Sequence, residues 1–584
     1  MIEKMTKYSF ILLDREREGF LEELAGLGVM DITRSTKPID ERSAEMLAGA
    51  ESLGRRIALL ESGNWVRDEQ YAALVGDKEE AERTYAEREP WGAYDQKKVS
   101  ALENSGVFFH YYIIPEKKFD PQWEDQYAAR VICRKDGKVW MVVATSDSGS
   151  PGIPVKELPR PVTSLDEERK RIEDLKAAIA RREEELETER KGLPALKAEY
   201  ASRKQELDLY WARATGTRAA EDHLVVYEGF APTQKDQALA AELDKSGAFW
   251  FREAAVTEDN PPIKLKNNKF VRMFEVLTDM YGRPDYNEFD PTPYISIFFL
   301  LFFAMCMGDA GYGLMLIIGG ILLRKVDSFK DLAPLVTTLG VATFLVGIVM
   351  HTFFGVDIAA LPWIPSWLKA VMITGTIGGF EAQMVLSLAI GVVHLCLAMI
   401  VKTVYATRNQ GFLGSLGVWG WTLLIVGGVI LAAVGMLKLI PAGILKWIVI
   451  GLGVVSALGI FLFNDIHRNP LKNIGSGLWE TYNTVTGLLG DVLSYLRLYA
   501  LGLAGGMLGK AFNDIAAMTL GDGGFGPGWL AFILILVIGH ALNLAMCCLG
   551  AFVHPLRLNF LEFFKNSAYD GKGRKYQPLG NNNN

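Results

Sequence analysis

An arginine near the middle of a long apolar segment is the first residue whose position suggests chemistry. Residues 488–511 read LLGDVLSYLRLYALGLAGGMLGKA, which is long and apolar enough to cross a bilayer, yet they include Arg497. A charge at that depth costs at least about 2.5–3.5 kcal/mol on insertion scales, so a functional role is expected. On a helical period of 3.6, the side with Arg497 carries small or apolar residues: Gly490, Ser494, Ala500, Ala504 and Leu508. Small side chains let another surface approach the guanidinium, which predicts that Arg497 meets a charge from elsewhere.

A second set of polar residues lies in the last apolar segment, residues 528–564. On the same period they form a stripe about 100° wide, made of His540, Asn543, Cys547, Gly550, His554 and Arg557. Such a stripe predicts one wet face, although pairing with neighbouring helices would also satisfy these groups. We favour the wet face, because stray polar residues rarely align over five turns. Pro555 lacks an N–H group and is expected to kink the helix beside Arg557.

Other candidate residues give weaker signals. His394 stands in an apolar segment without an acidic or second histidine partner in sequence, which favours a satisfied core histidine over a ligand. The five cysteines are scattered and form neither a disulfide framework nor a metal-ligand set. The glycines of 502–510 have the wrong spacing for a phosphate-binding loop. The sequence therefore predicts no nucleotide, cofactor or metal site in this chain.

The charges divide the 584 residues into two unlike halves. Residues 1–290 contain 44 basic and 56 acidic side chains, whereas the remainder contains 17 and 12 and most of the long apolar runs. This pattern predicts an acidic soluble half joined to a polytopic membrane half. An acidic half without a basic stripe argues against a nucleic-acid partner. The first residues lack the apolar stretch of a signal peptide, so we expect the N-terminal half to remain in the cytoplasm.

Eight apolar segments are predicted in the membrane half, which we place at residues 269–584. They lie at about 294–307, 310–324, 332–355, 383–404, 415–437, 442–463, 484–519 and 528–564. With a cytoplasmic N-terminus, eleven Lys and Arg residues fall in inside loops and three in outside loops, which is the expected positive-inside bias. Both termini are then predicted to be cytoplasmic.

The soluble half, residues 1–268, is predicted to be a dumbbell of two α/β lobes on a rod. A strand–helix–strand pattern occurs at both ends of this half, so residues 1–39 and 220–258 are expected to share a ferredoxin-like proximal lobe. Apolar residues recur every seven positions from Leu165 to Leu207, which predicts an antiparallel coiled coil of 40–88 with 164–213. Gly192 and Pro194 should kink it. The distal lobe, 89–160, contains a hairpin that turns at Asp136-Gly137, and 259–268 form a linker.

Several motifs resemble the membrane stator subunits of rotary V/A-type ATPases, called subunit a or subunit I, of the bacterial or archaeal type. The resemblance covers nearly the whole chain. Its most specific motifs are SYLRLYALGLA at 494–504 and AFVHPLRLNFLEFF at 551–564, supported by EFDPTPY at 288–294, MGDAGYGL at 307–314, YEGFAP at 227–232 and PPIKLKNN at 261–268.

The resemblance implies that Arg497 faces the ion-binding carboxylates of a rotor ring and that Arg557 is a supporting arginine. Half-channels for H⁺ or Na⁺ would then lie beside Arg497, with Ser494, Asp491, His540, Asn543 and His554 as candidate lining residues. The implied partners are the rotor ring of proteolipid subunits, peripheral stalks at the soluble lobes, the catalytic ATPase head through those stalks, and the lipid bilayer. The implied location is the inner or plasma membrane of a prokaryote.

Two positions depart from the family pattern, and other functions remain to be weighed. Pro555 stands between the histidine and arginine of the second motif, where the family usually lacks a proline. Cys547 replaces a glutamate of the eukaryotic branch, so the acid of one half-channel is unidentified. A secondary transporter with a cytosolic domain would require internal repeats and broken helices, and no repeat is apparent. A purely structural membrane scaffold leaves Arg497 unexplained.

Overall fold

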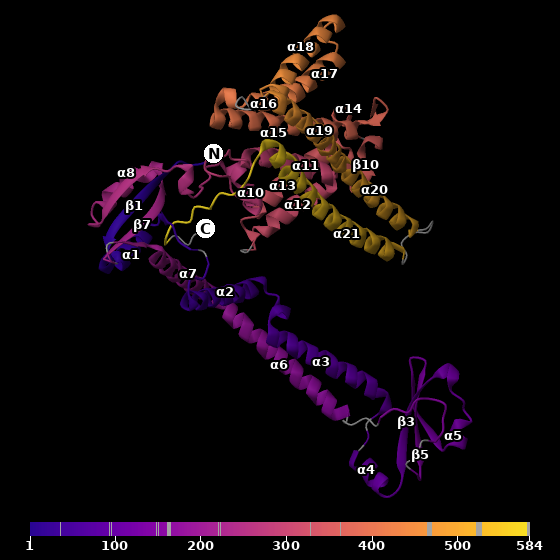
Figure 1. Cartoon of the computed structure of the whole chain (residues 1–584). Helices are drawn as coiled ribbons and strands as arrows, with labels where there is room; N and C mark the ends of the chain where they lie inside the picture. The colour runs from indigo at the N-terminus through magenta and orange to yellow at the C-terminus, as the bar shows by residue number, and fades with distance from the viewer. Residues whose placement is uncertain are drawn as a thin grey trace. The chain divides into compact units, whose positions relative to one another are not determined.

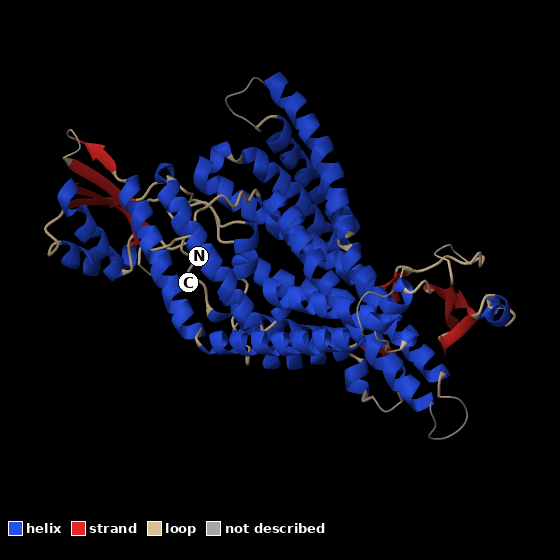
Figure 2. Ribbon diagram, turned by 90° about the horizontal axis from the view of Figure 1, so that it is seen from below, coloured by secondary structure: helices blue, strands red, loops and turns tan. Residues whose placement is uncertain are grey.

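A computed structural model describes residues 1–580, except 36, 93, 95, 148, 150, 160–164, 220, 222, 327–328, 363, 464–469 and 521–527. The described chain is mostly helical (Figure 2). It forms two compact units, one comprising Met1–Ser35 with Trp211–Asn584 and the other Thr36–Tyr210. The boundary that we place between a soluble domain and a membrane domain at residue 268 stays a prediction.

The first unit begins with a sheet built from both ends of the N-terminal half. Its strand order is β2-β7-β1-β8, with β1 at Met5–Leu13, β2 at Asp31–Ile32, β7 at Leu224–Pro232 and β8 at Phe249–Ala254. All the pairings are antiparallel, as in a ferredoxin-like sheet, and a short β6 (Thr217–Ala219) adds to β7. Helices α1 (Arg17–Leu27) and α8 (Asp236–Leu243) connect the strands (Figure 1). The two distant sequence patterns therefore share one sheet, as predicted.

The second unit contains two helical segments that run antiparallel to two others. Tyr71 of α3 (Glu69–Arg88) donates to Glu183 of α6 (Leu165–Lys191), and Arg88 donates to Glu168 of the same helix. Tyr210 of α7 (Leu193–Thr215) likewise donates to Asp40 at the start of α2 (Glu41–Ser62). The predicted heptad positions from Leu165 to Leu207 are buried or half-buried, and the helix breaks at Gly192 as expected. Residue 164 lies outside the described residues, and a regular coiled-coil rod stays a prediction.

One buried carboxylate connects three of these helices. Asp68 caps α3 by accepting from the Tyr71 amide, and it also accepts hydrogen bonds from Arg56 of α2 and Arg182 of α6. Its side chain is 6 % exposed. Burial alone would raise the pKa of Asp68, but the hydrogen bonds from Arg182, Tyr71 and Arg56 lower it to about 2.

The same unit holds a small three-stranded sheet with the order β3-β5-β4. Strand β3 is Phe108–Pro115, and β4 (Ala129–Lys135) and β5 (Lys138–Thr145) form the predicted hairpin. Asp136 and Gly137 both have positive φ, of 50° and 68°, which suits a tight two-residue turn. Helix α4 (Gln96–Asn104), the short α5 (Trp123–Gln126) and 3₁₀ turns complete this lobe.

Among the described residues, five helical segments are long and apolar enough to cross a membrane, judged by length and composition. They are Ala382–Gly414, Leu416–Met436, Ala442–Phe461, Leu471–Met518 and Gly528–Ser567. Three shorter apolar helices precede them, α11 (Thr292–Met307), α12 (Ala310–Leu323) and α13 (Ala333–Val349). These segments overlap the predicted positions, but the seventh begins at Leu471 and not at 484. The count of eight membrane spans stays a prediction.

The apolar helices share one core, and the C-terminal residues return to the N-terminal sheet. The core is rich in aromatic side chains, including Phe299 and Phe302 of α11, Tyr495, and Phe563. After the last helix, residues 573–579 run beside 263 and 283 and then against the β2 end of the sheet, where the Gln577 amide donates to Asp31. The C-terminal segment thus links the apolar helices to the proximal sheet (Figure 1).

Candidate functional site

Two antiparallel helices position Arg497. Helix α20 (Leu496–Met518) follows α19 (Pro470–Ser494), and it packs against α21 (Gly528–Arg557). The Asn543 side chain of α21 donates to the Gly505 carbonyl at 2.9 Å, and glycines at 505 and 539 leave room for Cys547 and Phe512 of the facing helix. Because α20 and α21 are antiparallel, residue numbers decrease along α21 in the direction in which they increase along α20. This register places Arg497 at the level of His554 to Arg557, so the two predicted arginines and His554 come together.

Arg497 has little support from its own chain. It is half-buried, and its buried Nη1 atom has no hydrogen-bond partner among the described residues. Nδ1 of His554, whose charge environment includes both Arg497 and Arg557, is also buried and unpaired there. Arg557 is exposed. An unsatisfied guanidinium nitrogen at membrane depth is costly unless another group completes it, so the geometry favours a partner beyond this chain.

A cavity of about 280 Å³ lies along α19, on one side of Arg497 in the helix direction. We call it the Asp491 cavity, and its polar lining includes Lys402, Glu480, Asn483, Asp491, Lys565 and Asn566. Asp491 accepts a hydrogen bond of 2.8 Å from Asn566, and Lys565 lies 3.4 Å from the same carboxylate. Ser494 is one turn further along, where its hydroxyl donates to the Gly490 carbonyl. Polar side chains that can bind water therefore lie within two helical turns of Arg497.

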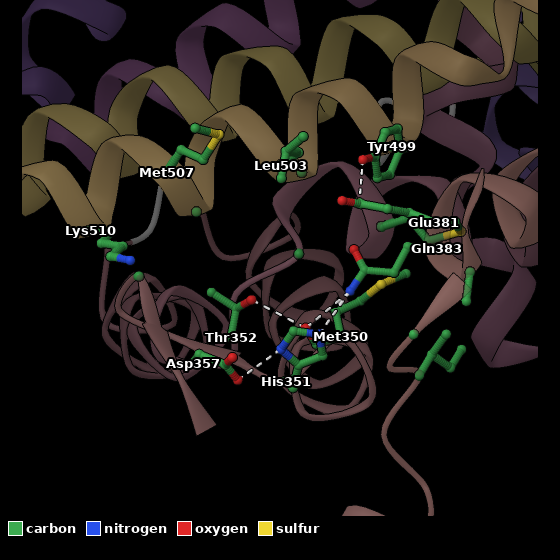
Figure 3. A pocket seen from close by; sticks show the side chains of 18 of the residues that line it. Met350, His351, Thr352, Asp357, Glu381, Gln383, Tyr499, Leu503, Met507 and Lys510 are labelled. Atoms are coloured by element: carbon green, nitrogen blue, oxygen red, sulfur yellow. Dashed lines mark hydrogen bonds and ion pairs between the residues drawn. The ribbon is translucent and has the colours of Figure 1, made fainter. Parts of the chain in front are cut away.

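A larger cavity of about 430 Å³ lies along α20, on the other side of Arg497 in the helix direction. We call it the Glu381 cavity; Tyr499, Leu503, Met507 and Lys510 of α20 form one wall of it (Figure 3). On the facing wall Glu381 accepts a hydrogen bond from Tyr499, and His351 Nδ1 lies 3.0 Å from Asp357. Gly355, with a φ of 72°, brings the loop backbone so close to α20 that a Cβ would lie 2.3 Å from the Lys510 nitrogen. In this cavity, polar and charged side chains of the facing wall therefore lie opposite the mostly apolar wall formed by α20.

The two cavities stop short of Arg497 from opposite directions. The Asp491 cavity ends at Asp491, six residues before Arg497, and the Glu381 cavity begins at Tyr499, two residues after it. Among the described residues the two linings share no member and neither includes Arg497. Tyr499 and Gly506 also lie on the far side of α20 from Arg497 on a 3.6-residue period. The segment that carries the half-buried Arg497 therefore separates the two cavities.

The predicted stripe on α21 divides into paired and unpaired parts. His540 Nδ1 contacts the Tyr312 hydroxyl at 2.8 Å, and its Nε2 contacts the Asn513 side chain at 3.0 Å. Asn543 donates to the same Tyr312 hydroxyl at 2.7 Å and is 1 % exposed. These two residues pair with neighbouring helices, which is the alternative that the sequence left open. His554, further along, has no partner for Nδ1 among the described residues.

His394 is a core residue, as expected, but it is only half satisfied. It is fully buried, and its ring stacks on Phe563 with centroids 4.8 Å apart and packs on Phe298 at 4.1 Å. Nδ1 lies 2.9 Å from the Tyr495 hydroxyl, whereas Nε2 has no partner among the described residues. His394 thus braces the helix break that precedes Arg497.

Three carboxylates of this region were not among the predicted site residues. Asp309, within the MGDAGYGL motif, accepts four backbone hydrogen bonds, from the amides of 311, 312, 354 and 355, and is fully buried. Glu381 and Glu562 were missed because neither stands out in its own segment. Glu562 lies within the second motif, and that motif was the only signal in the sequence that could have indicated it.

Comparisons with known proteins agree with the family resemblance that these motifs indicate. Residues 155–331 match the model of the V-type ATPase 116kDa subunit family. The chain is 33 % identical to the A-type ATP synthase subunit I of Methanocaldococcus jannaschii over 61 % of this chain and 55 % of that protein. It is 34 % identical to that of Pyrococcus abyssi over 55 % and 48 %. The chain thus spans about half the length of these archaeal relatives.

A bacterial relative matches from end to end. The V-type ATP synthase subunit I 1 of Treponema pallidum is 26 % identical over 99 % of this chain and all of that protein. The predicted resemblance to this family of subunits is therefore confirmed.

Proposed function

We propose that this chain, similar to the subunit I proteins of A-type and V-type ATP synthases, is the membrane stator subunit of a rotary ATPase. In this role it forms two half-channels against a rotor ring and couples the passage of H⁺ or Na⁺ to ATP hydrolysis or synthesis by partner subunits. The chain itself supplies no nucleotide chemistry. Its part is to hold a fixed positive charge and two separate aqueous routes in a rigid arrangement.

Arg497 acts through charge. A rotor carboxylate that carries its ion is neutral in lipid, and an opposite charge nearby favours the ionised form, which releases the ion. Arginine suits this position because its guanidinium stays protonated in proteins and cannot relay a proton. Arg557, His554 and Ser494 surround the same level of the helix pair as supporting groups.

The observation that supports this proposal most strongly is the pair of cavities on either side of Arg497. The Glu381 cavity lies along α20 and the Asp491 cavity along α19, and neither lining extends past Arg497 among the described residues. A direct leak would have to cross the guanidinium, whereas a ring carboxylate can carry the ion around it. The positive-inside bias assigns the Asp491 cavity to the cytoplasmic side and the Glu381 cavity to the opposite side.

The partners follow from this role. The exposed side of α20, with Ala500, Leu503, Ala504 and Met507, is the surface proposed to face the ring. The soluble units would hold the stator to peripheral stalks and through them to the catalytic head. The proposed location is a prokaryotic cell membrane with both termini in the cytoplasm.

Side-specific labelling tests the two half-channels. In a cysteine-free whole complex, Thr484→Cys in the Asp491 cavity should react with a membrane-impermeant thiol reagent only from the cytoplasmic side. Thr352→Cys in the Glu381 cavity should react only from the opposite side. Val454→Cys, on the exposed face of α18 (Ala442–Phe461), is the matched lipid-facing control and should react from neither. Labelling of both cavity positions from one side would contradict the proposal.

A further inference from the structure

Five unpaired buried polar atoms lie on Arg497 or on the elements packed around it. Within the described part of the chain they include His394 Nε2, Arg497 Nη1, His554 Nδ1, Asn559 Oδ1 and Glu562 Oε2. These residues lie on α20, α21 and its continuation, or contact Tyr495 at the start of α20. Buried polar atoms in folded proteins are nearly always paired, so a group of exceptions in one place marks a site at which chemistry is expected.

Glu562 is the one carboxylic acid in this group. The residue is 4 % exposed. It lies in a π-helical segment, Leu558–Phe563, that follows Pro555, and the Asn559 side chain donates to the Pro555 carbonyl at 2.8 Å. π-Helical turns inside α-helices occur frequently at functional sites, because they re-aim side chains. Here the wider turn directs Glu562 into the helix contact.

Glu562 lies close to Asp491, at the end of the Asp491 cavity that is nearer to Arg497 in the sequence. Its charged and polar neighbours are Ser494, Asp491 and Arg557. Lys565 and Asn566, one turn beyond it, line the cavity and contact Asp491. Ser494 is one turn before Arg497. A proton that leaves the inner end of the cavity therefore meets Glu562 before it reaches the level of the arginine.

We propose that Glu562 is the proton-relaying carboxyl group of the Asp491 half-channel. This inference rests on the proposed function and narrows it, because it commits the transported ion to H⁺. In the pumping direction, a hydronium ion in the cavity loses a proton to the Glu562 carboxylate, forming its O–H bond. That bond then breaks as the proton passes to an ionised carboxylate of the rotor, and Glu562 returns to its starting form. One proton moves, and no other bond changes.

The measurement is ATP-driven proton uptake by proteoliposomes that contain the whole complex, between pH 5.5 and 8.5. Glu562→Gln keeps the shape of the side chain but cannot titrate, so it should lower uptake at least tenfold across this range. Glu562→Asp keeps a titrating group and should retain more uptake, with an altered pH profile. Glu258→Gln, at an exposed turn outside the apolar helices, should match the unaltered complex.

Several results would overturn the relay. Uptake by Glu562→Gln above half of the unaltered rate would do so, as would equal losses in the Gln and Asp variants, which would indicate a steric role. If the Gln variant fails to assemble, the pH profile of the Asp variant decides, and an unaltered profile counts against the proposal. A complex that carries Na⁺ and no protons also excludes the relay while leaving the stator role intact. Normal uptake after Arg497→Ala would instead remove the proposed function itself.

Discussion

At the scale of single residues, two charged side chains among the apolar helices differ in how far their hydrogen bonds are satisfied. Arg497 lacks a hydrogen-bond partner for one nitrogen among the described residues, whereas Asp309 uses both oxygens on four backbone amides. The first arrangement leaves a charge available to a partner, and the second holds the α11–α12 turn in place. Both residues lie in apolar helical surroundings, so the hydrogen-bond partners distinguish a charge that is satisfied within the chain from one that is not.

Asp68 provides a test of the second unit that does not involve the membrane. Asp68→Asn should destabilise the packing of α3 on α2 and α6 by about 2 kcal/mol, because Arg182 and Arg56 lose hydrogen bonds to a buried anionic acceptor. Hydrogen exchange of α3 amides in the whole chain should then quicken by about thirtyfold. Glu189→Gln, which alters an exposed partner of Arg56, is the control and should change exchange little. Equal effects of the two substitutions would contradict this role.

The same carboxylate predicts a pH dependence. Folding lowers the pKa of Asp68 to about 2, below the value of about 3.9 in an unfolded chain. Its contribution to stability is therefore complete above about pH 5 and declines as the pH falls towards 2. Acid-induced loosening of α3, followed by hydrogen exchange between pH 5 and 3, should be present in the unaltered chain and absent in Asp68→Asn. A similar acid response in both would show that other groups cause it.

At the scale of elements, the sequence located the long helices but could not decide what their polar faces do. The 3.6-residue period aligned His540, Asn543 and His554 on α21, and that alignment is correct. Whether each group is paired depends on Tyr312 and Asn513, which lie more than 200 and about 30 residues away from His540. No periodic pattern marked Glu381 as a residue of the cavity beside α20, because it lies outside the periodic helical segments.

The C-terminal segment is structured although no sequence pattern predicts it. Residues 573–579 bond to 263, 283 and 30, and Leu579 is fully buried. Arg574 lies 3.4 Å from Asp31, whose side chain is 1 % exposed. This segment therefore joins the helical segment that carries Arg557 and Glu562 to the proximal sheet.

A substitution at Gly573 tests whether these contacts hold the C-terminal segment in place. An added methyl group at Gly573 would lie 1.9 Å from the Pro284 carbonyl oxygen, so Gly573→Ala should displace the segment. Trypsin should then cleave after Lys572, Arg574 or Lys575 at least tenfold faster in the folded chain. Gly26→Ala, where an added methyl meets nothing within 4 Å, is the matched control. Unchanged cleavage in Gly573→Ala would mean that the contacts do not hold the segment.

At the scale of the whole molecule, composition and periodicity predicted the shared N-terminal sheet, the helix break at Gly192, the Asp136-Gly137 hairpin and the position of each apolar helix. These features depend on local pattern or on turn residues, which a single sequence carries. The two cavities could not be predicted, because each forms between segments that are distant in the sequence, such as α20 and Glu381, which are more than 100 residues apart. The grouping of the proximal sheet with the apolar helices likewise depends on long-range contacts, those of residues 573–579.

The central claim is that the fixed charge of Arg497 drives ion release from a rotating partner. ATP-driven ion uptake into proteoliposomes holding the whole complex, with assembly measured separately, tests it most directly. Arg497→Ala should abolish uptake while the complex still assembles, because the neighbouring Ser494, Ala500 and Ala504 already form a small-residue surface. Arg497→Lys should also be severely impaired, since lysine lacks the planar fork and deprotonates when desolvated. Arg557→Ala, at an exposed position, should be milder. Uptake near the unaltered rate in Arg497→Ala would contradict the claim and make the arginine a structural residue.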